Sequence, residues 1–295
     1  MKAFAPGKLI LAGEHAVVYG HPAIAFAVDL GTEAELTPCE GQSELLPSTA
    51  EDWDGQARTL DTDGRLREAL GLVLPAQGVR LRLSTRLPVG RGMGSSAALS
   101  IAVIRAAARL QGREADLDEQ LHLGMAMERV FHGNPSGLDH TVSARGGALW
   151  YRREAGALAL EPLALPALRF VVLDSGVAGN TAELVAGVAA RRPEVDPVLA
   201  EIGALVPQVR AALDQPMLLG SLLTYNHHLL QRLGVSTDRL DALVRLALDT
   251  GALGAKLCGA GGGGVVLALV ADPAPLLAAA QAAHVPAKAL SPALP

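Results

Sequence analysis

The segment GRGMGSSAALS, residues 90–100, has the residue types and the spacing of an anion-binding loop. Its three glycines occupy alternate positions, so the backbone can adopt positive φ angles and approach a ligand without interference from side chains. Two serines and an apolar run follow the last glycine. If a helix begins at these serines, its unpaired N–H groups and its dipole attract an anion. The segment therefore predicts a loop that binds phosphate.

Two carboxylates elsewhere in the chain are placed to do further chemistry. Residues 116–131 have an apolar stripe at helical spacing, and Glu128 lies on it three residues after Met125. Burying an unpaired carboxylate is costly, so Glu128 either lies at the edge of the stripe or meets a cation. Asp139 follows a turn-rich stretch in HGNPSGLDH, residues 132–140.

The elements around the glycine loop have the order that an anion site requires. VRLRLST, residues 79–85, alternates apolar and polar residues as a half-buried strand does, and it leads into the loop. The segment after the loop has helix-forming composition and stops at Gly112. Arg105 and Arg109 are expected on the solvated side of this helix. The sequence thus predicts strand, loop and helix in succession.

Further elements are expected along the rest of the chain. A helix should run from about Asp116, with capping chemistry at its start, to Phe131. Residues 148–153 and 169–175 are predicted strands, and a final glycine-rich loop leads into a short strand. Residues 180–250 have a helical pattern. Their prolines mark breaks or first turns, at Pro193, Pro197, Pro207 and Pro216.

Three familiar patterns are absent or weak. The Walker pattern G-x-x-x-x-G-K-[ST] is absent, because Gly7-Lys8 lacks both the upstream glycine and a following hydroxyl residue. Residues 259–264 fit G-x-G-x-x-G, but a dinucleotide fold needs a strand before the motif and a helix after it, and here the order is reversed. His227-His228 has no carboxylate or cysteine at metal-binding spacing, so a surface or packing role is expected.

Composition and charge exclude several function classes. With 295 residues, the chain can form one large domain or two. The sequence is 50% hydrophobic but only 3% aromatic, so Ala, Leu and Val must build the core. The net charge of −5, with Lys and Arg scattered, argues against a nucleic-acid partner. Because Lys8 and Glu14 interrupt any signal-peptide core and no segment has the roughly 18 apolar residues of a membrane helix, a cytoplasmic protein without membrane association is expected.

Four motifs follow one another along the chain: APGKLILAGEHAVVYG (5–20), PVGRGMGSSAA (88–98), ERVFHGNPSGLDH (128–140) and GAKLCGAGGGG (254–264). Together they resemble the mevalonate kinase family of the GHMP kinase superfamily. The glycine-serine loop alone indicates only the superfamily, whereas Glu-His followed by Tyr-Gly-His-Pro, together with HGNPSGLD, narrows the resemblance to this family. The resemblance covers most of the chain and is closest to bacterial members.

This resemblance implies an α+β protein with the two-lobed GHMP kinase fold. Residues 1–165 are expected to form an N-terminal lobe like domain 2 of ribosomal protein S5, which carries the phosphate loop and the catalytic aspartate. Residues 166–295 are expected to form a C-terminal, ferredoxin-like α/β lobe. The boundary is placed where Pro162 and Pro166 precede the strand at 169–175.

The activity that the resemblance implies is ATP-dependent phosphorylation of the C5 hydroxyl of mevalonate, with Mg²⁺ as cofactor. Asp139 would accept the hydroxyl proton, and Lys8 beside it would favour the ionised carboxylate and stabilise developing negative charge. Glu128 and Ser96, or Ser95 in its place, would hold Mg²⁺. The expected partners are ATP and mevalonate, and relatives are often homodimers.

The resemblance also implies two sets of binding residues. Those expected to bind the substrate are Glu14, His15, Thr181, Gly259 and Ala260. Those expected to bind the phosphates of ATP are Pro88, Gly90, Arg91, Gly92, Met93, Gly94, Ser95, Ser96 and Ala97. These positions follow from the motifs of the family, residue by residue.

The sequence departs from the family pattern at three positions. Arg91 stands where relatives usually carry a small residue, and it either leans toward a phosphate or points to water. Met93 replaces a usual leucine. Gly179 stands where some relatives carry an arginine that meets the substrate carboxylate, so the cation for that carboxylate is open.

Two other classes of function remain alternatives. One is another GHMP kinase, for phosphomevalonate, homoserine or a sugar; a phosphorylated acceptor would call for more basic residues than these motifs hold. The other is a catalytically silent nucleotide-binding regulator, against which the presence of Asp139, Lys8 and Glu128 argues.

Overall fold

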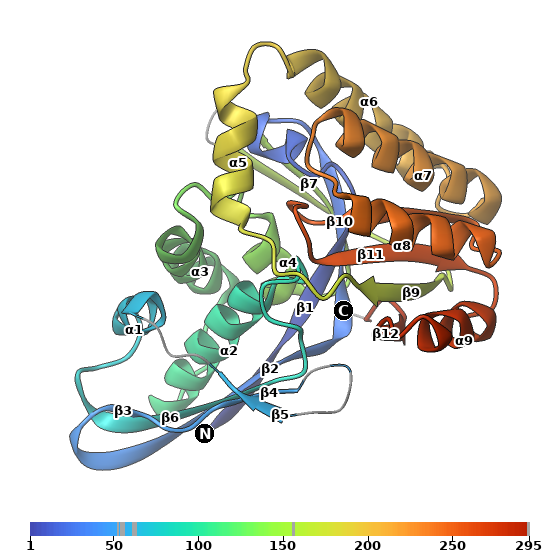
Figure 1. Ribbon diagram of the computed structural model, residues 1–295. Helices are drawn as coiled ribbons and strands as arrows, with labels where there is room; N and C mark the ends of the chain where they lie inside the picture. The colour runs from blue at the N-terminus through green and yellow to red at the C-terminus, as the bar shows by residue number, and fades with distance from the viewer. Residues whose placement is uncertain (52, 54–56, 61–63, 155–156, 294–295) are drawn as a thin grey trace. The chain divides into compact units, whose positions relative to one another are not determined.

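The computed structural model describes residues 1–51, 53, 57–60, 64–154 and 157–293 (Figure 1). Its contacts define two compact units that interleave along the chain. Unit 1 comprises Met1–Lys8, Asp29–Val89 and Gly94–Gly146, and unit 2 the remainder. Helices and strands are mixed, which confirms the α+β prediction, while the division at residues 165 and 166 stays a prediction. None of the helices described has the length and apolar character needed to cross a bilayer.

Unit 1 places helices on strands through an alanine- and leucine-rich core. Strand β6 pairs antiparallel with β2, and its alternate residues are buried, which confirms the half-buried strand predicted at 79–85. Helix α2 contributes the largest share of the core, followed equally by α1 and β6. The strands are β1 (Lys2–Ala12) and β2 (Ala23–Gln42), both shared with unit 2, β3 (Glu44–Leu45), β4 (Thr49–Glu51), β5 (Ala57–Thr59) and β6 (Gln77–Thr85); the helices are α1 (Gly64–Gly71), α2 (Ser95–Leu110), α3 (Leu117–His132) and α4 (Leu138–Arg145).

The helices of unit 1 follow the local signals of the sequence, with one exception. The Asp116 carboxylate accepts a hydrogen bond from the Glu119 N–H and caps α3, as expected. Arg105, expected in solvent, is half-buried instead. Its guanidinium donates to the Gln120 side chain and to the carbonyls of Phe4 and Ala144. Burial lowers the pKa of this guanidinium, and the carbonyl acceptors compensate for the lost water.

Unit 2 contains an antiparallel sheet in the order β10-β11-β9-β12, with α7 and α8 packed on β10 and α9 on β9 and β12 (Figure 1). Strands β7 and β9 confirm the strands predicted at 148–153 and 169–175. The elements are η1 (Ala16–Tyr19), β7 (Ala148–Glu154), β8 (Ala157–Leu163), β9 (Arg169–Asp174), α5 (Thr181–Ala190), α6 (Asp196–Ala211), α7 (Pro216–Arg232), α8 (Asp238–Asp249), β10 (Gly254–Cys258), β11 (Val265–Val270), α9 (Ala274–Ala282) and β12 (Ala287–Leu290).

The prolines of the helical region behave as predicted at three of four positions. Pro193 lies between α5 and α6, while Pro197 and Pro216 lie in the first turns of α6 and α7. Pro207 was expected to break or begin a helix, and it lies inside α6 instead. The apolar face of α6 is buried on both sides of this position, at Leu205, Val206 and Val209, so packing outweighs the lost backbone hydrogen bond.

Candidate active site

The glycine loop leads directly into a helix, as the sequence predicts. Helix α2 begins at Ser95, and Gly94 is its N-cap with a φ of 71°. Gly90 and Gly92 also have positive φ, at 73° and 80°. The first turn of a helix leaves N–H groups without partners in the helix, so residues 95–97 present donors at this end. This conformation is compatible with the predicted binding of phosphate, which stays a prediction.

The residues of this loop are divided between the two units. Residues 90–93 belong to unit 2, and Gly94 and the residues of α2 belong to unit 1. In unit 2, the Gly179 N–H donates to the Gly90 carbonyl over 3.1 Å. A Cβ added to Gly92 would lie 2.7 Å from the Cys258 carbonyl oxygen, so only glycine fits there. Before the loop Pro88 is buried, and within it Met93 is buried while Ser95 and Ser96 are half-buried.

Within unit 1, the structure brings Lys8 and Asp139 together. Lys8 is only 2% exposed, and its Nζ lies 3.2 Å from Asp139 Oδ2. Asp139 lies in the first turn of α4, whose N-cap is Gly137, and its side chain is 33% exposed. The stem of Lys8 passes close to the start of α2, where a Cβ on Gly94 would lie 3.0 Å from Lys8 Cγ. A buried cation thus faces a carboxylate that solvent, or a substrate, can reach.

Glu128 lies in the same unit and is buried. It is 2% exposed in the last turn of α3, and its Oε1 has no hydrogen-bond partner among the described residues. Burial, and then the charge of Asp139, raise the pKa of Glu128 to about 8, while a hydrogen bond from Ser96 and the charge of Lys8 oppose the shift. Of the two readings of the apolar stripe, the edge position is therefore wrong.

His132 is a residue of this cluster that sequence reasoning missed. Its Nε2 lies 3.1 Å from Ser96 Oγ and 3.8 Å from Glu128 Oε2, and burial lowers its pKa. The available signal was its position four residues after Glu128, on the same helix face. Helices α2, α3 and α4 pack against one another and bring these groups together with Asp139.

The oxygen atoms of this cluster fit a magnesium ion whose coordination shell other ligands complete. Mg²⁺ prefers oxygen ligands and is usually held by one or two carboxylates together with phosphates and water. Ser96 Oγ and the unpartnered Glu128 Oε1 are such oxygens. Within the described part of the chain, no group of three or more His, Cys, Asp or Glu side chains could hold a metal. Two protein oxygens would leave the other coordination positions of such an ion to phosphates and water.

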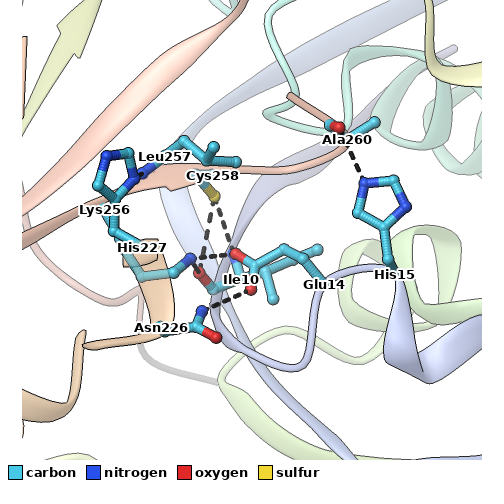
Figure 2. A network of polar contacts seen from close by, with 9 residues as sticks. All are labelled: Ile10, Glu14, His15, Asn226, His227, Lys256, Leu257, Cys258 and Ala260. Carbon is cyan, nitrogen blue, oxygen red and sulfur yellow. Dashed lines mark hydrogen bonds and ion pairs between the residues drawn. The ribbon is translucent and has the colours of Figure 1, made fainter. Parts of the chain in front are cut away.

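A second group of predicted residues meets in unit 2 (Figure 2). Glu14 is 1% exposed, and its carboxylate pairs with the ammonium of Lys256 and accepts a 3.0 Å hydrogen bond from Asn226 Nδ2. His15 Nε2 lies 2.9 Å from the Ala260 carbonyl oxygen, so two predicted substrate-binding residues are in contact. Burial lowers the pKa of His15 and favours the neutral imidazole.

The glycines at 259–264 connect two antiparallel strands. Strand β10 ends at Cys258 and β11 begins at Val265. The expected strand after the loop is confirmed, but a strand also precedes it, so the sequence reading of a reversed order was incomplete. Because no helix follows, the exclusion of a dinucleotide fold is confirmed.

The two adjacent histidines of α7 have the packing and surface roles expected of them. His227 is buried, with Nε2 lying 3.1 Å from Asp241 Oδ1 and Nδ1 accepting from the Leu257 N–H. His228 is exposed. One is a packing residue and the other a surface residue.

Comparison with known proteins places the chain in a family. Residues 59–147 match the GHMP kinases N terminal domain, and residues 209–285 match GHMP kinases C terminal. Mevalonate kinases from Thermococcus sibiricus and Pyrococcus horikoshii are both 39% identical to the chain; the matches cover 92% and 90% of it, and 89% and 88% of those proteins. The chain belongs to the mevalonate kinase family.

The fold of this chain agrees with that of a solved structure from the same family. The L. major mevalonate kinase in complex with R-mevalonate has a TM-score of 0.83 and 26% sequence identity, and the match covers 99% of this chain and 95% of that one. The resemblance to the mevalonate kinase family and the GHMP kinase fold are thereby confirmed. The expected nearness to bacterial members stays a prediction.

The structure gives a reason for one departure from the family pattern. A Cβ added to Gly179 would lie 2.6 Å from the Gly261 carbonyl oxygen, so the arginine that some family members carry does not fit here. Thr181, two residues later, is the half-buried first residue of α5, and its predicted contact with substrate stays a prediction.

Arg91, a second position at which the sequence departs from the family pattern, is held inside unit 2. Its Nε lies 3.3 Å from Asp174 Oδ1, and its Nη2 donates to the Gly176 carbonyl over 3.0 Å. The side chain is 19% exposed, and Nη1 is buried without a partner among the described residues. Arg91 therefore does not extend freely into water, and its predicted contact with a phosphate stays a prediction.

The raised pKa of Glu128 predicts how stability depends on pH in metal-free protein. The carboxyl group ionises near its ordinary value of 4.5 in the unfolded chain and at about 8 in the folded chain. Between these values the folded state holds the extra proton, so stability should fall as pH rises from 4.5 toward 8. Glu128→Gln, which stays neutral, should flatten this slope when unfolding by urea is measured in EDTA from pH 5 to pH 8.5. Equal slopes in both proteins would contradict the burial of an ionisable Glu128.

Proposed function

We propose that this protein transfers the γ-phosphoryl group of ATP to the C5 hydroxyl of mevalonate, producing 5-phosphomevalonate and ADP. The observation that carries the proposal is the cluster of unit 1, in which Lys8, Asp139 and Glu128 accompany the helix start at the glycine loop. The names of the relatives supply the substrate, because those proteins are mevalonate kinases at 39% identity over most of the chain.

The residues of the cluster divide the work of phosphoryl transfer. Such transfer needs positioned phosphates and neutralised charge more than covalent chemistry by the protein. Loop residues 90–97 and Pro88 are proposed to bind the phosphates, with α2 directing its N-terminus at them. Ser96 and Glu128 would hold Mg²⁺, which neutralises charge on the phosphates when bound.

Asp139 is proposed to accept the proton of the acceptor hydroxyl as its oxygen bonds to the γ-phosphorus and the bond to ADP breaks. Lys8, 3.2 Å from that carboxylate, would stabilise the negative charge that develops there. The substrate itself is proposed to contact His15, Thr181, Gly259 and Ala260. Glu14, predicted with them, is not proposed to contact it, because its carboxylate is buried and pairs with Lys256. Assembly as a homodimer and a cytoplasmic location remain predictions.

The experiment that tests the function is ATP consumption with a panel of acceptors. Purified protein with Mg²⁺-ATP is offered mevalonate, phosphomevalonate, homoserine and galactose in separate reactions, and ADP release is followed. We expect turnover with mevalonate and none with the other three. Turnover of another acceptor, without turnover of mevalonate, would reject the assignment and favour a different GHMP kinase. ATP binding without any turnover would favour a regulator.

A further inference from the structure

The Glu14–Lys256 pair is the most deeply buried ion pair among the described residues. The two side chains are 1% and 0% exposed, and they join residues 242 positions apart in the chain (Figure 2). Lys256 Nζ also donates to the Ile10 carbonyl over 3.2 Å, and the Ile10 N–H donates to Cys258 Sγ over 3.2 Å. The end of β1 is thus fixed to β10 through side chains.

Both oxygens of Glu14 have partners inside unit 2. Oε1 meets Lys256 and Oε2 accepts from Asn226. A carboxylate with both oxygens engaged and only 1% of its surface exposed does not present itself to a substrate. The role of Glu14 must therefore be carried by what it holds in place.

Stability alone is a weak reason for such a pair. Removing two charges from water is costly, and replacing a buried ion pair by apolar residues is often neutral or stabilising. Removing only one partner is strongly destabilising, because it leaves a buried charge uncompensated. The ion pair instead fixes the distance and direction between its two side chains, which apolar contacts do not.

The residue immediately after Glu14 has a backbone conformation that must be held in place. His15 has a φ of 59° and a ψ of −48°, a positive-φ conformation that is strained for a residue other than glycine. Its ring reaches the Ala260 carbonyl in the glycine turn that follows β10 (Figure 2). Two contacts therefore join residues 14 and 15 to β10 and the turn after it: Glu14 with Lys256, and His15 with Ala260. The carbonyl accepts, so the neutral ring carries its proton on Nε2 and offers Nδ1 as an acceptor.

We infer that Glu14 and Lys256 form a buried positioning pair, which holds His15 in its strained conformation and in a single tautomer against the Ala260 carbonyl. The inference rests on the proposed function only in that His15 is the member of this motif that meets the substrate. Glu14 acts through His15 and does not itself contact the substrate. Asn226, which donates to Glu14, is part of the same support.

The test removes both charges at once, so that neither is left buried alone. In Glu14→Gln/Lys256→Met, glutamine keeps an acceptor for Asn226 and methionine keeps the apolar stem. We expect a folded protein with a Tm near that of the wild type, and a kcat/KM for mevalonate lowered about 10- to 100-fold, mainly through KM. The matched control is Glu201→Gln/Arg232→Met, which removes an exposed pair of the same unit with a 2.7 Å contact and should leave both values unchanged.

A double-mutant cycle shows whether the pair acts through His15. In a His15→Ala background the same double substitution should change kcat/KM by less than about threefold, because the group being positioned is gone. A loss as large as in the wild-type background would overturn the inference and make Glu14 an independent substrate ligand. A large fall in Tm with unchanged kinetics of the folded protein would also overturn it.

A readout that needs no substrate separates this inference from the proposed function. The ¹⁵N spectrum of the imidazoles, with the His15 signal assigned by its loss in His15→Ala, should show a proton fixed on Nε2 in the wild type. In Glu14→Gln/Lys256→Met it should show the two tautomers in exchange. An unchanged His15 signal would refute the positioning role, even in an enzyme that turns over mevalonate.

Discussion

Asp139→Asn should lower kcat by about 10²-fold or more while ATP still binds. The amide retains the shape of the side chain and an oxygen near Lys8, but it cannot accept a proton from the acceptor hydroxyl. Because Asp139 is 33% exposed in the first turn of α4, its replacement by asparagine should leave the fold intact. ADP release under saturating substrates measures kcat, and calorimetric titration with Mg²⁺-ATP measures nucleotide binding.

A matched control for this variant is Asp118→Asn. Asp118 is an exposed carboxylate in the first turn of α3, in the same unit, and it lies outside the cluster. It should retain wild-type kcat. Near-normal turnover in Asp139→Asn would remove Asp139 from the role of base and leave the cluster with positioning and charge neutralisation alone.

Lys8→Met should lower kcat by about 10²–10³-fold, the scale for removing one preorganised group that stabilises developing charge. Lys8 is 2% exposed, 3.2 Å from Asp139, and its charge acts on Glu128 as well. Methionine preserves much of the stem beside Gly94, but it removes the positive charge that acts on both Asp139 and Glu128. The rate is measured by the same assay as for Asp139→Asn.

The control for Lys8→Met lies on the same strand. Lys2 is 59% exposed and pairs with Glu33 over 3.0 Å, so Lys2→Met should keep wild-type activity. If Lys8 and Asp139 act as a unit, the double variant should be no slower than the poorer single variant. Strictly additive losses would show that the two residues contribute separately.

The parts of the fold that local sequence rules govern were predictable. The alternation at 79–85, the glycine loop, the helix start at Ser95 and the cap at Asp116 each depend on residues a few positions apart. Arg105 was misplaced because its acceptors at Phe4 and Ala144 come from distant segments that no local pattern reveals. Burial of a guanidinium depends on such acceptors and not on helix periodicity.

In the candidate site, too, local features were predictable and features that depend on distant segments were not. The types of its groups were evident from the sequence, including the cost of burying Glu128 on an apolar stripe. Its depth and its raised pKa were not, because they depend on how α2, α3 and α4 pack together. The partners of Glu14 were hidden for a similar reason, since Asn226 and Lys256 lie 212 and 242 positions further along the chain.

That long separation between Glu14 and Lys256 has a consequence for how the chain is made. The amino-terminal corner leaves the ribosome long before its lysine exists, so the carboxylate stays hydrated while most of the protein is synthesised. Closing a loop of this length carries an entropic cost before its contacts form, and non-local contacts of this kind slow folding. Unit 2 can therefore complete its first corner only after β10 has been synthesised, although that corner was among its first residues to emerge.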